Sequence, residues 1–214
     1  MAGPGKARQG KARFFYTERK KMMQSEKKWK IITRGISDIM FDRYAGDNKT
    51  DLLPEQKMYF AEDGRTLVLP STNIMSLLSA QNTPSAPKRF LDTRKYKAVA
   101  QAILSYVSIQ PSQIPILRKG KPIKFNGFEN DLDKQAQVYI HRTVARLDKG
   151  IPNPKARPTV SVPWGLEFEL IYFPNDEFNE TLLFDLLSRG LLAIGLGTFR
   201  GVYGKCVIDS KEKL

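Results

Sequence analysis

Hydrophobic residues in the last third of the chain follow two different periods, which predict a strand, then a helix, then a second strand. Residues 166–170 alternate strictly between apolar and acidic side chains, as in a half-buried strand, and this strand continues to Phe173. Leucines within 182–192 line one helical face, and Gly195 ends the helix. The apolar residues of 202–208 then predict a final strand.

Earlier in the chain, the pattern predicts a strand followed by a hairpin. Residues 31–41 are apolar and β-branched at intervals, which indicates a strand with an irregularity at Gly35. Residues 58–69 form two apolar runs around Asp63 and Gly64. This pair predicts a hairpin, because Asp-Gly supplies the positive φ angles that tight β-turns need.

The middle of the chain is predicted to hold two helices, edge strands and an insertion. Residues 70–72 (Pro-Ser-Thr) favour the start of a helix with a side-chain hydroxyl cap, and apolar residues within 95–107 recur at helical spacing. Prolines stop the second helix, and 114–117 with Ile123 can form edge strands. Residues 126–163 are polar, weakly patterned and rich in proline, so we expect a protruding insertion there.

Charge adds a candidate partner. The chain holds 35 Lys and Arg against 22 acidic residues, a net charge of +13, which concentrates polyanions by long-range attraction. A solubilising positive surface is the alternative interpretation.

The N-terminal arm, residues 1–30, carries ten of these cations and two acids, with aromatic residues between them. Such an arm can neutralise phosphates and stack on bases, although a disordered solubilising tail has the same composition. We divide the chain into this arm and a domain over residues 31–214. The candidate contacts in the arm are Lys11, Arg13, Phe14, Phe15, Lys20 and Lys21.

Catalytic and metal-binding interpretations find little support. His141 is the only histidine and Cys206 the only cysteine, so neither a multi-histidine nor a cysteine-rich metal site can form. We expect no metal and no cofactor, a core position for Cys206, and a nucleic-acid contact at His141 and Arg142. No apolar run approaches membrane length, and we expect a cytoplasmic protein of a prokaryotic or phage-infected cell.

A glycine series near the C-terminus is the most informative motif. Its glycines follow a predicted helix and precede a strand, the reverse of a dinucleotide-binding fingerprint, and no Gly-Lys-Ser/Thr follows as in a phosphate loop. Backbone N–H groups with nearby cations can cradle phosphates, whereas glycines needed only for turns are the structural alternative. The series comprises Gly195, Gly197, Gly201 and Gly204, with Thr198, Arg200 and Lys205 among them.

Three segments, 41–46, 63–78 and 195–205, together resemble RAMP-superfamily proteins. The similarity is nearest to the guide-RNA-binding backbone subunits of CRISPR effector complexes and to stand-alone phage or mobile-element relatives. The resemblance implies an α+β fold, with a ferredoxin-like or RNA-recognition-type βαββαβ core, a glycine-rich loop and residues 126–163 as a thumb-like insertion.

The resemblance also implies the partners and the contact residues. Several copies would line up along a guide or transcript RNA in a ribonucleoprotein, with a complementary target nucleic acid as a further partner and no membrane. Cleavage by a histidine occurs in some members, but His141 does not align with that position. The expected RNA contacts are Arg43, Tyr44, Ser71, Thr72, Asn73, Lys88, Arg89, Arg94, His141, Arg142, Gly197, Thr198, Phe199, Arg200, Gly201, Tyr203 and Lys205.

Three functions therefore remain open. A non-catalytic RNA-binding protein that holds the sugar-phosphate backbone is favoured. A single-stranded DNA-binding protein of phage replication or recombination is second, because phosphate contacts and base stacking serve either type of strand. An RNA-processing endoribonuclease is third.

Overall fold

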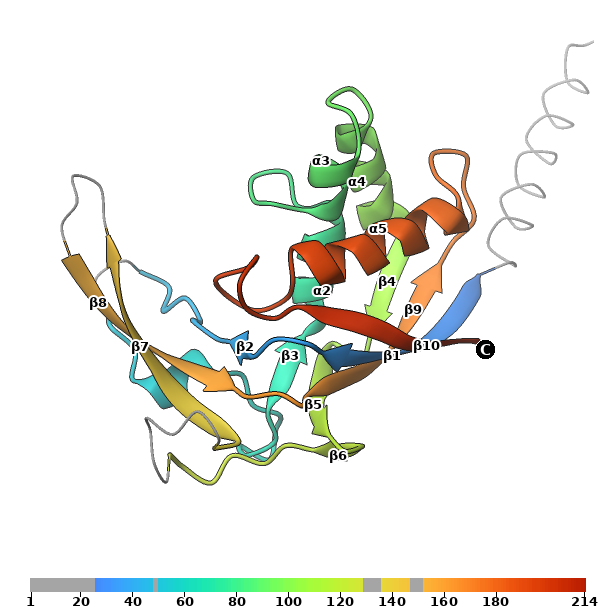
Figure 1. Ribbon diagram of the computed structural model, residues 1–214. Coiled ribbons are helices and arrows are strands. Elements are labelled where there is room, and N and C mark those ends of the chain that lie inside the picture. Colours follow the sequence, from blue (N-terminus) through green and yellow to red (C-terminus); the bar gives the residue numbers. More distant parts are fainter. Residues whose placement is uncertain (1–25, 48–49, 129–135, 147–151) are drawn as a thin grey trace, which may run out of the picture.

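The computed structural model of the chain describes residues 26–47, 50–128, 136–146 and 152–214. A large antiparallel sheet carries the helices on one face, and a small second sheet extends away from it (Figure 1). The helices are α2 (Ser71–Ser79), α3 (Ala86–Phe90), α4 (Tyr96–Tyr106) and α5 (Glu180–Ala193), with a 3-10 turn η1 (Pro54–Lys57).

The large sheet contains β1 (Lys27–Gly35), β3 (Val68–Pro70), β4 (Val107–Gln110), β5 (Gln113–Arg118), β6 (Lys121–Pro122), β9 (Gly165–Tyr172) and β10 (Cys206–Lys213). Its order is β10-β1-β9-β5-β3, and β4 pairs with β9 beside β5. Six parts of this order, β1, the helices α2 to α4, β4, β9, α5 and β10, form the βαββαβ arrangement of ferredoxin-like folds, and the other strands are inserted between them. The predicted α+β fold class is confirmed.

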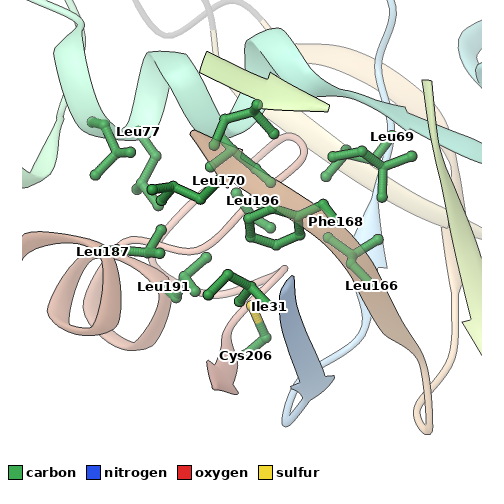
Figure 2. Close-up of a cluster of buried hydrophobic side chains, with 14 of the residues drawn as sticks. Ile31, Leu69, Leu77, Leu166, Phe168, Leu170, Leu187, Leu191, Leu196 and Cys206 are labelled. Atoms are coloured by element: carbon green, nitrogen blue, oxygen red, sulfur yellow. The ribbon is translucent and has the colours of Figure 1, made fainter. Parts of the chain in front are cut away.

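The core lies between this sheet and the helices. Leu166, Phe168 and Leu170 alternate toward the helical face of β9, as the sequence pattern predicts, and meet the leucines of α5 (Figure 2). Cys206 at the start of β10 is fully buried in the same cluster, as expected. Burial raises the pKa of its thiol to about 12.

The predicted strand over 31–41 is wrong, since two strands in two different sheets cover this segment. β1 ends at Gly35, a position that requires glycine because a Cβ there would lie 2.3 Å from the Trp164 ring. The chain then crosses to the small sheet, where β2 (Ile39–Met40) pairs with β8 (Pro152–Val160).

The start of β1 shifts the expected boundary between arm and domain. The strand begins at Lys27, inside the segment assigned to the arm, and Trp29 is only 3% exposed. Trp29 packs edge-on against Phe184 of α5, with ring centroids 5.2 Å apart. Residues 27–30 therefore belong to the folded domain. The candidate contacts of the arm, from Lys11 to Lys21, lie outside the described residues.

The insertion is more regular than its sequence suggests. β7 (Val138–Arg146) pairs with β8 over its whole length, and together with β2 they form the small sheet, which we call the thumb. Three prolines of β8 lie an even number of residues apart, so their backbone groups face the same side of the strand: Pro152, Pro154 and Pro158. The Pro158 carbonyl accepts a hydrogen bond from the Phe41 N–H rather than from β7. The nitrogens of the three prolines thus point away from β7, where no ladder hydrogen bond requires an N–H group.

The base of the thumb is anchored in the core through Val138 and Val160. Across the described parts of the chain, no helix is long and apolar enough to span a membrane.

Candidate nucleic-acid interface

The glycine loop, residues 195–205, connects α5 to β10 and requires its glycines for steric reasons. All four have positive φ, from +72° to +94°. A Cβ on Gly204 would lie 1.9 Å from the Leu196 carbonyl oxygen, and one on Gly197 would lie 2.5 Å from that of Met40. Gly201 differs, because no atom lies within 4 Å of its Cβ position and only its φ of +94° favours glycine.

The backbone amides of this loop are largely occupied inside the protein. Leu196 N–H donates to the Gly204 carbonyl, Gly204 to Asp38 and Thr198 to Met40, at 2.7 to 2.9 Å. Gly201 donates to the Ile194 carbonyl and Lys205 to the Ser37 hydroxyl. These groups cannot also bind phosphate, so the predicted cradle of backbone amides is wrong at these positions, and side chains are the available contacts.

The outer rim of the loop combines exposed apolar side chains with a half-buried cation. Phe199 has a left-handed backbone (φ +58°) and is 57% exposed, and Val202 is 60% exposed. A non-glycine residue in this conformation costs about 1–2 kcal/mol, and such strain concentrates at functional sites. Between them, the half-buried Arg200 donates from Nε to the Gly197 carbonyl at 3.3 Å, and burial lowers the pKa of its guanidinium.

The start of α2 joins this loop directly. Asn73 Oδ1 accepts a hydrogen bond from the Gly197 N–H at 2.9 Å, so the two predicted contact regions are adjacent. The expected hydroxyl cap is wrong: Pro70 occupies the N-cap position, no side chain caps the helix, and the Ser71 N–H donates to the Ser112 carbonyl. Thr72 is exposed at this helix start.

The thumb meets the loop through His141 on β7. The Tyr203 hydroxyl lies 3.4 Å from His141 Nδ1, and the ring centroids are 5.5 Å apart. Arg142, the next residue, is exposed. Burial, with a smaller contribution from the Asp38 charge, raises the pKa of Tyr203.

Asp38 ties the thumb to the glycine loop, and no feature of the sequence marks it. Its Oδ2 accepts from the Tyr139 hydroxyl at 2.8 Å and its Oδ1 from the Val162 N–H at 2.9 Å. Its backbone carbonyl accepts from Gly204 at 2.7 Å. Burial and the hydrogen bond to Asp38 raise the pKa of Tyr139. All three partners are more than a hundred residues distant, so no local motif could have identified Asp38.

The remaining predicted contacts lie elsewhere. Lys88 and Arg89 belong to α3 in the helical layer, and Arg94 follows it (Figure 1). Lys88 donates to the Gln81 carbonyl, and Arg89 lies over Phe90. All three cations are exposed, and none of them belongs to the glycine loop, α2 or the thumb.

Arg43 and Tyr44 follow β2 and line two surface hollows. The smaller, about 230 Å³, is lined by Lys57 and Lys155 but also by Asp42, Asp47 and Asp51, so it offers no excess positive charge. The larger, about 460 Å³, is mainly apolar.

The sheet face opposite the helices is not a base-stacking platform. RNA-recognition motifs place aromatic rings on their central strands. Here the central strands β1 and β9 instead present Lys30 paired with Glu167 at 2.7 Å, and Arg34 pairs with Asp209 on β10 at 3.1 Å. Because these cations are paired with acidic side chains, this sheet face attracts an anionic strand less than the glycine loop and the thumb do.

Within the described residues, no cluster of three or more His, Cys, Asp or Glu side chains could hold a metal ion.

Fold and site together define an α+β protein whose glycine loop, first helix and thumb converge on one cationic and aromatic surface. The sequence matches no protein-family model and no curated protein. Among solved structures, the chain is similar to one in the cryo-EM structure of the Type III-B Cmr-beta bound to cognate target RNA. That likeness has a TM-score of 0.58 and 12% identity, and it covers 95% of this chain and 66% of the other. The chain thus spans just under two thirds of that protein's length and shares its fold.

Proposed function

We propose that this protein binds single-stranded RNA along its sugar-phosphate backbone, without cleaving it. The observation that carries the proposal is the convergence of three segments distant in sequence: the glycine loop contacts Asn73 of α2 and His141 of β7. The +13 charge and a fold shared with a chain of an RNA-bound assembly support it.

The contacts would come from side chains rather than from loop amides. Arg200, Lys205 and Arg142 supply charge-assisted hydrogen bonds to phosphate, and the exposed Phe199 ring supplies a surface for base stacking. Because phosphate contacts carry no sequence information, this grip suits a guide RNA of any sequence.

Binding of a fluorescein-labelled single-stranded RNA, followed by anisotropy, tests the proposal. Arg200→Ala should weaken binding by about 1–3 kcal/mol, the value of a charge-assisted hydrogen bond. Arg65→Ala is the matched control, because it removes the same charge from the exposed Asp63-Gly64 turn. Equal losses in the two variants would mean that only net charge matters and that the loop is not the interface.

Assembly along the RNA is part of the proposal. A chain with +13 charge repels its copies when free, so assembly should depend on the polyanion. Light scattering should show the mass of the complex rising stepwise with RNA length. A dimer of constant mass, formed with or without RNA, would contradict this arrangement.

The absence of cleavage is tested separately. Purified protein should leave labelled RNA intact with and without Mg²⁺, and His141→Ala should at most weaken binding. Cleavage that disappears in His141→Ala would favour the endoribonuclease instead, and tighter binding of DNA of the same sequence would favour the single-stranded DNA-binding protein.

A further inference from the structure

The larger hollow beside Tyr44 has apolar and aromatic lining residues that suit a flat heterocycle. It measures about 460 Å³, within the range of small-ligand pockets. Leu52, Met58 and Phe60 supply apolar lining, and Phe60 is braced by Phe125 at 5.8 Å between ring centroids. Tyr44 forms one side and is 65% exposed, so most of its ring is open to a ligand.

Three polar or charged side chains also line this hollow: Arg43, Glu55 and Gln56. Within the described residues, no hydrogen bond or ion pair engages the Glu55 side chain, which lines the hollow. Gln56 Oε1 accepts from the Leu53 N–H at 2.9 Å, which fixes the side chain and leaves its amide NH₂ as a donor. Arg43 lies over the Tyr59 ring at 5.7 Å and places a cation beside the opening.

We infer that this hollow binds one unpaired nucleobase of the RNA strand, and that it favours bases with an exocyclic amino group. The inference rests on the proposed function and adds base selectivity to it. An aromatic side chain stacks on any base, whereas a carboxylate accepts a hydrogen bond only from a donor. Glu55 can therefore accept from the amino group of cytosine, adenine or guanine, while uracil presents a carbonyl oxygen at the corresponding position.

Oligocytidylate and oligouridylate of equal length are the matched probes, because cytosine carries an amino group at C4 where uracil carries a carbonyl oxygen. The parent protein should bind oligocytidylate about tenfold more tightly, as one discriminating contact provides. Glu55→Gln should abolish or reverse this preference, since an amide can donate to the uracil carbonyl. Tyr44→Ala should weaken both oligonucleotides at least fivefold, because the base then has no ring to stack on.

Leu104→Ala on α4 is the control for removal of an exposed apolar side chain, and it should bind both oligonucleotides as the parent does. Equal affinity of the parent for the two oligonucleotides, or a preference that Glu55→Gln leaves unchanged, overturns the base site while RNA binding stands. Failure of the parent to bind either oligonucleotide contradicts the proposed function, and the base site with it.

Discussion

Gly201 and Gly204 are both glycines with positive φ, but they are required for different reasons. A methyl group on Gly204 would collide with the backbone of Leu196, whereas one on Gly201 would enter open space. Gly204→Ala should therefore lower the thermal midpoint markedly. Gly201→Ala should cost only the strain of a left-handed alanine, about 1–2 kcal/mol.

Gly120→Ala in the turn between β5 and β6 is the matched control, because it has φ +76° and equally open surroundings. Calorimetry should show similar small shifts for Gly201→Ala and Gly120→Ala, and RNA binding should fall only for Gly201→Ala. A loss of stability from Gly201→Ala as large as that from Gly204→Ala would contradict the open geometry.

Cys206 should be inert while the protein is folded. Its thiol is buried and its pKa is raised from 9.0 to about 12, so the thiolate that reacts is scarce at neutral pH. A disulfide reagent at pH 8 should label it only as fast as the protein unfolds, and at once in denaturant. Because the folded pKa is the higher, this thiol's contribution to stability is complete below about pH 9 and is lost as the pH rises toward 12.

For single residues, the sequence identifies those whose role depends on their own backbone conformation. It misses those whose role depends on contacts with residues distant in the chain. The four loop glycines are recognisable because positive φ favours glycine wherever it occurs. Asn73 lies at the helix start as predicted, where its backbone is expected to contact RNA, but the sequence does not indicate that its Oδ1 accepts a hydrogen bond from the Gly197 N–H. Asp38 has no local signal at all, since its partners come from β7, the segment after β8 and the glycine loop.

Among elements, the Asp38 carboxylate joins the segment between β1 and β2 to Tyr139 of β7 and to Val162 after β8, while its backbone carbonyl holds the glycine loop. Tyr139→Phe should reduce the free energy of unfolding by about 0.5–1.5 kcal/mol, because it removes a 2.8 Å hydrogen bond. Asp38→Ala should cost more, about 1–3 kcal/mol, because it also removes the acceptor for Val162 N–H.

Asp38→Asn keeps one carbonyl oxygen for Val162 and offers an amide to the Tyr139 hydroxyl, so it should remain close to the parent. Urea denaturation measures all three variants. If Asp38→Ala is no less stable than Asp38→Asn, then the carboxylate does not join these elements.

The hydrophobic period predicts β9 and α5, but it does not predict the thumb. β9 and α5 present apolar residues at spacings of two and of three to four, so each is recognisable alone. In β8, prolines remove the usual strand signal, and only pairing with β7 shows that their nitrogens face away from the ladder.

For the whole molecule, charge and fold make separable contributions to binding. Residues 1–24 hold seven Lys or Arg and one Glu, and they precede β1. Their deletion should leave the thermal midpoint unchanged and should flatten the dependence of log K on log[salt]. The slope should fall by about 0.7 for each phosphate that the arm neutralises in the parent.

Deletion of residues 1–30 should instead unfold the protein, because it removes Trp29 and half of a strand that pairs on both sides. Circular dichroism and salt titrations of the two truncations test this boundary. A folded 31–214 fragment would support the division between arm and domain that the sequence alone suggests.

The position of β1 between β9 and β10 also determines when the protein can fold during synthesis. β1 pairs Trp29 with Lys213 across nearly the whole described chain, and its other neighbour, β9, comes late as well. Such distant pairings close large loops and form slowly. On the ribosome, β1 therefore emerges long before both partners, and it exposes one unpaired backbone edge until β9 has been translated and the other until β10 follows. A nascent chain of this fold needs protection at its N-terminal strand for almost the entire time of its synthesis.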